Sequence, residues 1–180
     1  SNTSQRANGQ PAALNTPGDA QTSMNGAVQT VTENDFIRGN PNAPLMFVTY
    51  MSYDCPSCKS YYFTMQRTII EQGLDGLVGW TFRPLPPKGD TEIAHSAYCA
   101  EELSTQDGFW DYSDIVFDSR DTARPVNRNN LVQYASSTGI STEAFTECQS
   151  SERHKNKITE LAAEARASVD ETPPYTVLMY

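Results

Sequence analysis

Two cysteines that are three residues apart are the strongest candidates for chemistry in this sequence. Cys55 and Cys58 form a C-x-x-C motif, with Pro56 and Ser57 between them. An apolar, β-prone run at 45–50 leads directly into the motif, and a pattern typical of a helix follows it. A C-x-x-C at a strand-to-helix turn is typical of a redox-active pair.

The position of this motif predicts how each sulfur acts. The unpaired N–H groups and the dipole of a helix N-terminus stabilise a thiolate placed just ahead of it. We therefore predict that Cys55 is the exposed nucleophile and that Cys58, one turn into the helix, resolves a mixed disulfide. Pro56 and Ser57 are expected to tune the reactivity of the pair.

Two other interpretations of the same motif remain open. Zinc sites use C-x-x-C spacing too, but a zinc knuckle needs a second close pair, and Cys99 and Cys148 lie far apart in the sequence. No metal site is therefore expected. An inert structural disulfide between Cys55 and Cys58 is the remaining alternative.

The elements around the motif predict a parallel unit. The run at 45–50 is nearly continuously apolar, as a buried parallel strand would be. The helix is expected from Pro56 to about Gln72, closed by Gly73, and a second strand at 77–83. Four residues recur at helical spacing and share a face that we expect to be buried: Cys58, Tyr62, Met65 and Ile69. A strand, a helix and a strand in this order favour a right-handed parallel crossover.

The region from Thr91 to about Val169 has a helical pattern throughout, in five segments. We expect its aromatic residues to belong to the core rather than to a substrate groove: Phe109, Trp110 and Phe117. His95 is expected to be packed or partly exposed and His154 to lie on a solvated face. A final strand is predicted at 175–180, and a short edge strand near the start of the domain at 28–31.

The bulk properties exclude several classes of protein. The chain has 180 residues and a formal net charge of −9 with scattered basic residues, which argues against a nucleic-acid binder. No apolar run approaches the roughly 20 residues of a membrane helix. Residues 1–27 contain no aromatic residue and few charges, so we expect a flexible tether.

The compartment is less sharply indicated. The chain does not begin with Met and shows no signal-peptide pattern, so either the protein is cytosolic or a leader or anchor has been removed. Four cysteines, an even number, are compatible with two disulfides and therefore with an oxidising compartment.

Several motifs together resemble the DsbA-like thiol–disulfide oxidoreductases of the thioredoxin superfamily. They are Gly39-Asn-Pro-Asn-Ala-Pro44, Cys55-Pro-Ser-Cys58, Tyr98-Cys99-Ala100, Phe109-Trp110, Phe145-x-x-Cys148 and Thr172-Pro173. The resemblance covers about 28–180. It implies an α/β, thioredoxin-like fold with a helical insertion at about 91–169. The strand and helix that normally end such a fold are expected to be missing, because the sequence stops at Tyr180.

The resemblance also assigns two further features. It implies that Pro173 is the cis-proline facing the redox motif, leaving the backbone of Thr172 free to pair with an extended peptide. From sequence alone, a trans proline that ends a helix is the alternative. It further implies a structural disulfide between Cys99 and Cys148, with two buried free thiols as the alternative.

Three positions depart from the family pattern or bear on it. Many relatives carry an acid six residues before the first redox cysteine, where this chain has Thr49, so we expect the proton of the buried thiol to leave through water or another group. Ser57 stands where strongly oxidising relatives often have His, and it brings no positive charge. Asp54, next to Cys55, is expected to be solvated.

The resemblance finally implies a function. It predicts an enzyme without a cofactor that forms disulfides in cysteine-containing secreted proteins, in the bacterial periplasm or cell envelope, with no nucleic-acid partner. A membrane redox partner would reoxidise it, and a membrane tether could precede Ser1. A disulfide reductase or isomerase, or a non-catalytic thioredoxin-fold binding module, is the alternative function.

Overall fold

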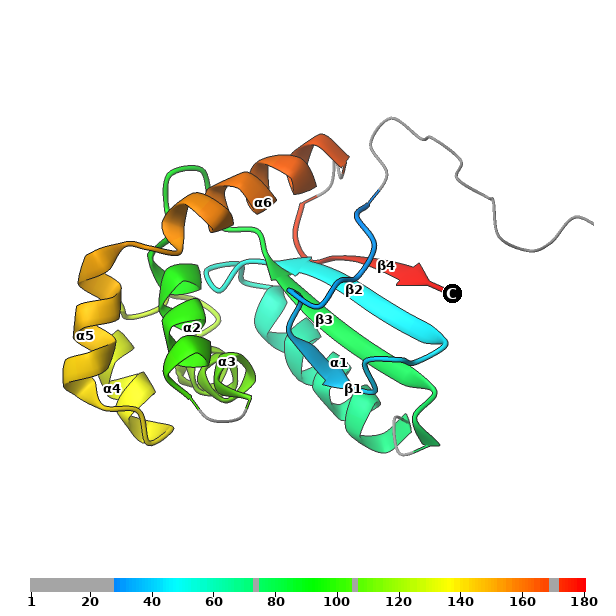
Figure 1. The fold of residues 1–180 in the computed structure, drawn as a ribbon, viewed down its shortest axis with the longest axis horizontal. Helices are drawn as coiled ribbons and strands as arrows, with labels where there is room; N and C mark the ends of the chain where they lie inside the picture. Colours follow the sequence, from blue (N-terminus) through cyan, green and yellow to red (C-terminus); the bar gives the residue numbers. More distant parts are fainter. Residues whose placement is uncertain (1–27, 73–74, 105–106, 169–171) are drawn as a thin grey trace, which may run out of the picture.

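The computed structural model describes residues 28–72, 75–104, 107–168 and 172–180. These residues form one four-stranded mixed sheet, together with a group of helices that lies beside it (Figure 1). The tether predicted at 1–27 and the helix end predicted at Gly73 lie outside the described residues.

The sheet has the strand order β1-β3-β2-β4. Its strands are β1 (Ile37–Gly39), β2 (Leu45–Met51), β3 (Val78–Pro84) and β4 (Tyr175–Met179). β2 and β3 are parallel and are joined through helix α1 (Cys58–Gln72), whereas β1 pairs antiparallel with β3 and β4 antiparallel with β2. The predicted strand–helix–strand unit is therefore confirmed, and it places the C-x-x-C motif at the carboxyl end of β2.

Helix α1 packs on the sheet through the face that the periodicity predicts. Cys58 and Tyr62 are fully buried, and Met65 and Ile69 are 7% and 4% exposed. Tyr62 stacks on Phe117, with ring centroids 4.3 Å apart. The same core takes in the aromatic residues predicted to be internal, which are all buried: Phe109, Trp110 and Phe117.

The chain between β3 and β4 is helical, as predicted. It contains α2 (Glu92–Leu103), α3 (Gly108–Ser119), a 3₁₀ turn η2 (Arg128–Asn130), α4 (Leu131–Ser137), α5 (Thr142–Ser151) and α6 (Lys155–Ser168). Helices α2 to α5 gather at one side of the sheet, and α6 leads back across it towards β4 (Figure 1). No helix in the described part of the chain is long and apolar enough to cross a bilayer.

The predicted edge strand at 28–31 is wrong. The edge strand near the start of the domain is instead β1, which pairs Gly39 with Gly79 of β3. Gly39 has φ +92, and a Cβ there would lie 2.8 Å from the carbonyl oxygen of Val78, so only glycine fits this close approach.

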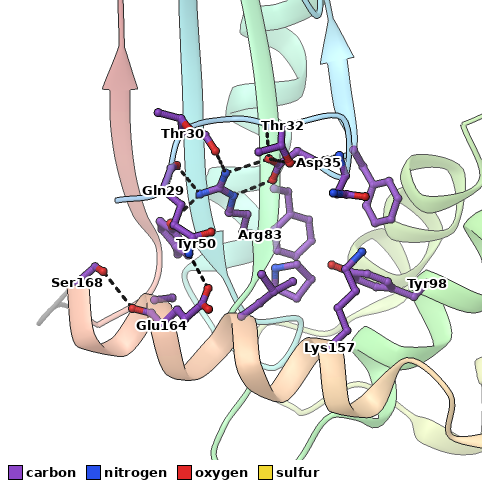
Figure 2. A pocket seen from close by; sticks show the side chains of 16 residues that line it. Gln29, Thr30, Thr32, Asp35, Tyr50, Arg83, Tyr98, Lys157, Glu164 and Ser168 are labelled. Atoms are coloured by element: carbon purple, nitrogen blue, oxygen red, sulfur yellow. Dashed lines mark hydrogen bonds and ion pairs between the residues drawn. The ribbon is translucent and has the colours of Figure 1, made fainter. Parts of the chain in front are cut away.

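Two carbonyl groups of this segment, those of Gln29 and Thr30, bind a side chain instead of a neighbouring strand. Figure 2 shows the guanidinium of Arg83 at the centre of this region, where it donates to the carbonyl oxygens of Gln29 (2.8 Å) and Thr30 (3.0 Å). Asp35 binds the same guanidinium at 2.7 and 2.9 Å. Burial acts to lower the pKa of Arg83, but its hydrogen bonds to Asp35 and Tyr50 outweigh this and raise it. An ion pair thus anchors this segment to β3.

Candidate active site

The turn between β2 and α1 holds the redox motif. The amide of Cys55 donates to the carbonyl of Ser52, and the amide of Cys58 donates to the carbonyl of Cys55, both at 3.2 Å. The helix therefore begins at Cys58, two residues later than predicted, because residues 55–58 form a turn of their own. Cys55 still lies immediately ahead of the first helical turn, where the N–H groups have no helical partner.

Cys55 and Cys58 form a disulfide, with Cα atoms 5.2 Å apart. The two sulfurs differ in accessibility: Cys58 is fully buried, whereas Cys55 is partly exposed. The hydroxyl of Ser57 lies 3.4 Å from the sulfur of Cys55. In the reduced state this hydroxyl can donate a hydrogen bond to a Cys55 thiolate. Ser57 can therefore act on Cys55 through a neutral hydrogen bond and not through a positive charge.

The proline loop faces the motif, but the cis bond differs from the prediction. The cis peptide joins Pro173 to Pro174, so Pro174 is the cis-proline and the prediction for Pro173 is wrong by one residue. The sequence offers two X-Pro bonds in a row, and their order along the chain alone does not distinguish them. The carbonyl oxygen of Pro173 lies 3.4 Å from the sulfur of Cys55, so Pro173 presents its backbone carbonyl to the motif.

A groove opens beside the accessible sulfur, with a volume of about 760 Å³. Its lining comes from three distant parts of the chain: Ser52, Asp54, Cys55, Pro56 and Ser57; Leu85, Pro86 and Pro87; and Arg166, Thr172 and Pro173. The guanidinium of Arg166 donates to the carbonyl of Pro86, which ties α6 to the opposite wall. A peptide lying in this groove would meet Cys55 among prolines, Leu85 and short polar side chains.

Asp54 is not solvated as predicted. Its carboxylate accepts from the guanidinium of Arg128 at 2.7 Å and from the amide of Val126 at 3.0 Å. Arg128 also pairs with Asp90 and Glu92, at 2.5 and 3.1 Å. Burial acts to lower the pKa of Arg128, but these carboxylates outweigh it and the net shift is upward. Asp54 therefore shares one guanidinium with two other carboxylates instead of being solvated.

Arg120 is a site residue that sequence reasoning missed. It is 4% exposed, and its Nη2 donates to the carbonyl oxygen of Asp54 at 2.7 Å. Its Nε and Nη1 are buried without a hydrogen-bond partner, and no carboxylate among the described residues pairs with it. A buried cation therefore contacts the backbone of the residue that precedes Cys55. No local pattern in the sequence indicated this contact.

A chain of hydroxyl groups occupies the region around Thr49, where the resemblance led us to look for an acid. The indole of Trp80 donates to the hydroxyl of fully buried Thr49 at 3.0 Å. That hydroxyl is hydrogen-bonded to Thr176 at 2.9 Å, and Thr176 to the partly exposed phenol of Tyr61 at 2.6 Å. Tyr61 lies one turn after Cys58 on α1, so the hydroxyl chain joins the sheet interior to the surface of the redox helix.

The second pair of cysteines also forms a disulfide. Cys99 on α2 and Cys148 on α5 are both fully buried, with Cα atoms 5.8 Å apart. His95 is packed beside them, as expected, and burial lowers the pKa of its imidazole. His154 is not simply solvated, because its Nε2 lies 2.8 Å from a carboxylate oxygen of Glu102.

Comparison with known sequences gives one family and several partial relatives. A family model described as Thioredoxin matches residues 31–177. The Na(+)/H(+) antiporter NhaA 1 of Mycolicibacterium gilvum is 27% identical over 113 residues, which is 63% of this chain but 18% of the antiporter. A Rickettsia bellii protein named "Putative protein-disulfide oxidoreductase" is 25% identical over 134 residues. The match covers 72% of this chain and 49% of that protein, so the chain spans at most about half of these relatives.

Solved structures share the fold at low sequence identity. The DsbA of Chlamydia trachomatis is similar with a TM-score of 0.68 at 15% identity, over 84% of this chain and 85% of that one. Oxidised BdbD of Bacillus subtilis gives 0.65 at 22% identity, over 80% of both chains. The architecture is therefore the thioredoxin-like fold of DsbA proteins, with the helical region between β3 and β4. The Thioredoxin family model matches most of the length of this chain, and the chain therefore belongs to the thioredoxin family.

Proposed function

We propose that the protein is a thiol–disulfide oxidoreductase that transfers the Cys55–Cys58 disulfide to cysteine pairs in secreted proteins. The observation that carries the proposal is the asymmetry of that disulfide. One sulfur, of Cys55, is partly exposed at a groove, and the other, of Cys58, is fully buried. A substrate thiolate can therefore attack Cys55, while Cys58 is shielded and serves as the leaving group.

The first step forms a mixed disulfide. The substrate thiolate attacks the sulfur of Cys55, the Cys55–Cys58 bond breaks, and Cys58 leaves as a thiolate that takes up a proton. The carbonyl of Pro173 can accept a backbone N–H of the bound peptide, as in strand addition. Proline has no N–H to return, so this loop offers a substrate one backbone hydrogen bond where another residue would offer two.

The second step releases the substrate. A second substrate thiolate attacks the substrate sulfur of the mixed disulfide, a disulfide forms in the substrate, and Cys55 leaves as a thiolate. The helix N-terminus, the hydroxyl of Ser57 and the buried charge of Arg120 all favour this thiolate. Two electrons have then passed from the substrate to the enzyme, which is left as a dithiol.

We further propose a compartment and a reoxidant for the protein. We place the protein outside the cytoplasm, in the periplasm or cell envelope, because all four of its cysteines are paired. A membrane redox partner would accept the two electrons and restore the Cys55–Cys58 disulfide. The name of the Rickettsia relative supports this class of reaction, and the DsbA and BdbD structures support the fold on which it depends.

The test uses two variants that make the same small change at the two sulfurs. Oxidised protein should restore activity to a reduced, unfolded secreted ribonuclease, and Cys55→Ser should abolish this. Reduced Cys58→Ser, mixed with a denatured protein that still holds its disulfides, should instead attack one of them through Cys55 and accumulate a mixed disulfide, because the second thiol that would resolve it is missing; the adduct is visible on a non-reducing gel. Full activity of Cys55→Ser would overturn the enzymatic proposal and favour a binding module.

The direction of electron flow needs a measurement in cells. Alkylation of free thiols in the native host, followed by mass spectrometry, gives the redox state of Cys55 and Cys58. A mostly oxidised pair supports the formation of disulfides. A mostly reduced pair would overturn it in favour of a reductase or isomerase.

A further inference from the structure

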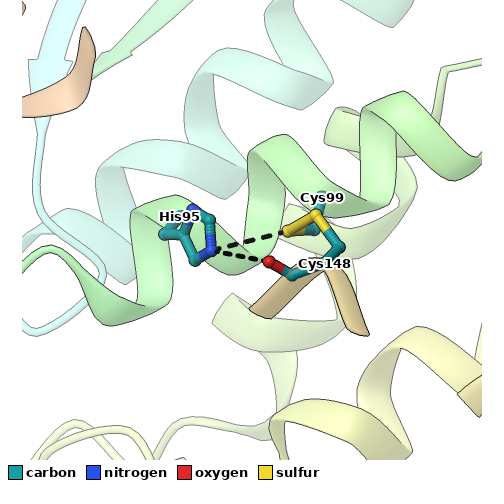
Figure 3. A group of neighbouring side chains, drawn as sticks. All are labelled: His95, Cys99 and Cys148. Atoms are coloured by element: carbon teal, nitrogen blue, oxygen red, sulfur yellow. Dashed lines mark hydrogen bonds between the residues drawn. A yellow bond between two sulfur atoms is a disulfide. The ribbon is translucent and has the colours of Figure 1, made fainter. Parts of the chain in front are cut away.

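A second group of reactive side chains lies away from the groove, around the buried Cys99–Cys148 disulfide. Figure 3 shows the ring of His95 facing this disulfide, with both His95 and Cys99 on α2. The Nε2 atom of His95 lies 3.7 Å from the sulfur of Cys99. The Nε2 atom and the two sulfurs all lie within 4.8 Å of one another. His95 is 2% exposed and has no part in the thiol–disulfide exchange proposed above.

A second set of ligand atoms shares the sulfur of Cys148 with the first. A carboxylate oxygen of Glu102, a ring nitrogen of His154 and the sulfur of Cys148 also lie within 4.8 Å of one another. The rings of His95 and His154 have centroids 5.5 Å apart. Glu102 is exposed and His154 is partly exposed, so this second set leads from the surface to the buried sulfurs.

We propose that reduction of the Cys99–Cys148 disulfide creates a zinc site formed by Cys99, Cys148, His95 and His154. A dithiol reductant supplies two electrons and two protons, which breaks the disulfide and leaves two thiols. Zn²⁺ then displaces a proton from each thiol, so that two thiolates and two imidazoles bind one ion. Two sulfur and two nitrogen ligands are a set typical of tetrahedral zinc.

The fourth position is assigned to His154 rather than Glu102 because the carboxylate is already occupied. Both oxygens of Glu102 accept from the guanidinium of Arg153. His154 contacts the same carboxylate through Nε2 at 2.8 Å, and one of its ring nitrogens already lies within 4.8 Å of the sulfur of Cys148, within reach of an ion bound there. Glu102 and Arg153 would then remain as an ion pair at the outer side of the metal.

The state of the His95 ring is compatible with a change of partner. While the disulfide is intact, Nε2 lies 3.2 Å from the carbonyl of Cys148 and 3.3 Å from that of Gln149, so it carries the proton and donates to them. Nδ1 is buried and has no hydrogen-bond partner. Metal binding moves the proton from Nε2 to Nδ1, which frees the Nε2 lone pair to bind the ion.

The backbone around the two cysteines also suits the change from a disulfide to a metal site. The sulfurs must separate to roughly 3.8 Å, the distance set by zinc–sulfur bonds of about 2.3 Å at a tetrahedral angle. The Cα atoms of Cys99 and Cys148 are already 5.8 Å apart, so rotation about the side-chain bonds supplies most of this change. The ion would then join α2 to α5 in the reduced chain, where the disulfide joins them in the oxidised one.

The experiment isolates this site from the redox motif. A Cys55→Ser/Cys58→Ser background retains only the second pair of cysteines. This protein, reduced with a phosphine, is titrated with Co²⁺ and then with Zn²⁺ against a chromophoric chelator. We expect one ion per chain, with the thiolate charge-transfer bands and intense visible bands of tetrahedral cobalt. The oxidised protein should bind neither metal at this site.

Variants test which residues hold the ion. His95→Gln and His154→Gln should each raise the zinc dissociation constant by more than about 10-fold, the least that even loss of an outer-shell partner costs. Ser150→Ala is the matched control, since this exposed residue two positions after Cys148 on α5 donates its hydroxyl proton to the carbonyl of Thr146 and should leave the affinity unchanged. Unchanged affinity in His95→Gln or in His154→Gln would overturn the proposed ligand set.

Circular dichroism covers the case in which the reduced chain loses its structure. Zinc should then restore the helical signal and raise the melting temperature of the reduced background protein, because an ion that binds only the folded state stabilises it. It should have no such effect on a reduced His95→Gln chain. A reduced background chain that stays unfolded in zinc, or that stays folded and binds none, would refute the site.

Discussion

The buried guanidinium of Arg120 should make this protein a stronger oxidant than its C-P-S-C motif alone predicts. Arg120 is 4% exposed, donates to the carbonyl of Asp54, and pairs with no carboxylate among the described residues. Its charge favours the Cys55 thiolate, which exists only in the reduced enzyme. A stabilised reduced form raises the reduction potential, so removing the charge in Arg120→Met should lower it.

The magnitude follows from Coulomb's law. Arg120 Nη2 is 2.7 Å from the carbonyl oxygen of Asp54, one residue before Cys55. Backbone dimensions then place the Cys55 sulfur on the order of 8 Å from the charge. At an effective dielectric constant of about 20, the attraction is about 2 kcal/mol. For a two-electron couple, in which 30 mV corresponds to about 1.4 kcal/mol, the potential should fall by about 40 mV.

The assay is equilibration of the Cys55–Cys58 pair in glutathione buffers, followed by tryptophan fluorescence or thiol alkylation. Arg120→Lys keeps the charge and should recover most of the potential. Arg124→Met is the matched control, because this arginine of the same loop has a side chain that is 82% exposed. Urea unfolding should show that Arg120→Met is folded, as expected for a buried arginine with two nitrogen atoms that have no hydrogen-bond partner. The reasoning is refuted if Arg120→Met and Arg124→Met have the same potential, or if Arg120→Lys falls as far as Arg120→Met.

Three further predictions concern the motif, the proline loop and the second disulfide. Ser57→His adds a cation beside the thiolate and should raise the reduction potential; a lower or unchanged value in glutathione equilibration contradicts it. Pro173→Ala supplies the missing backbone N–H and should bind a disulfide-linked peptide more firmly. In the Cys58→Ser background, free thiol should therefore attack the mixed disulfide about 2- to 12-fold more slowly, as one hydrogen bond of about 0.5–1.5 kcal/mol implies. An equal or faster rate argues against peptide pairing at this loop. Cys99→Ser/Cys148→Ser should lower the free energy of unfolding in urea by about 4 kcal/mol on the chain-entropy model, and a loss below about 1 kcal/mol would show that the crosslink contributes little.

The hydroxyl chain of Thr49, Thr176 and Tyr61 shows how far a single position in the sequence can mislead. Thr49 indicated only that an acid was absent. The structure instead joins it to a residue on β4 and a residue on α1, through bonds that span 127 and 115 positions of the sequence. No periodicity or motif encodes such a connection, because it depends on β4 pairing with β2.

The sequence by itself determined the features that depend on neighbouring residues. It placed a C-x-x-C at a strand-to-helix turn, identified the buried face of α1 from Cys58 to Ile69, and located the helical region between β3 and β4. These predictions held because backbone preference and apolar periodicity act over a few residues. The redox pair could therefore be found from the order of the residues alone.

Only the tertiary structure decided how that pair is surrounded. It placed the cis bond before Pro174 and paired the carboxylate of Asp54 with the guanidinium of Arg128. It also brought Arg120 to the carbonyl of Asp54 across 66 positions of the sequence. It also placed His95 beside the second disulfide. These arrangements arise when the helical region folds back against the turn, and the charges that set the chemistry of Cys55 come from that distant part of the chain.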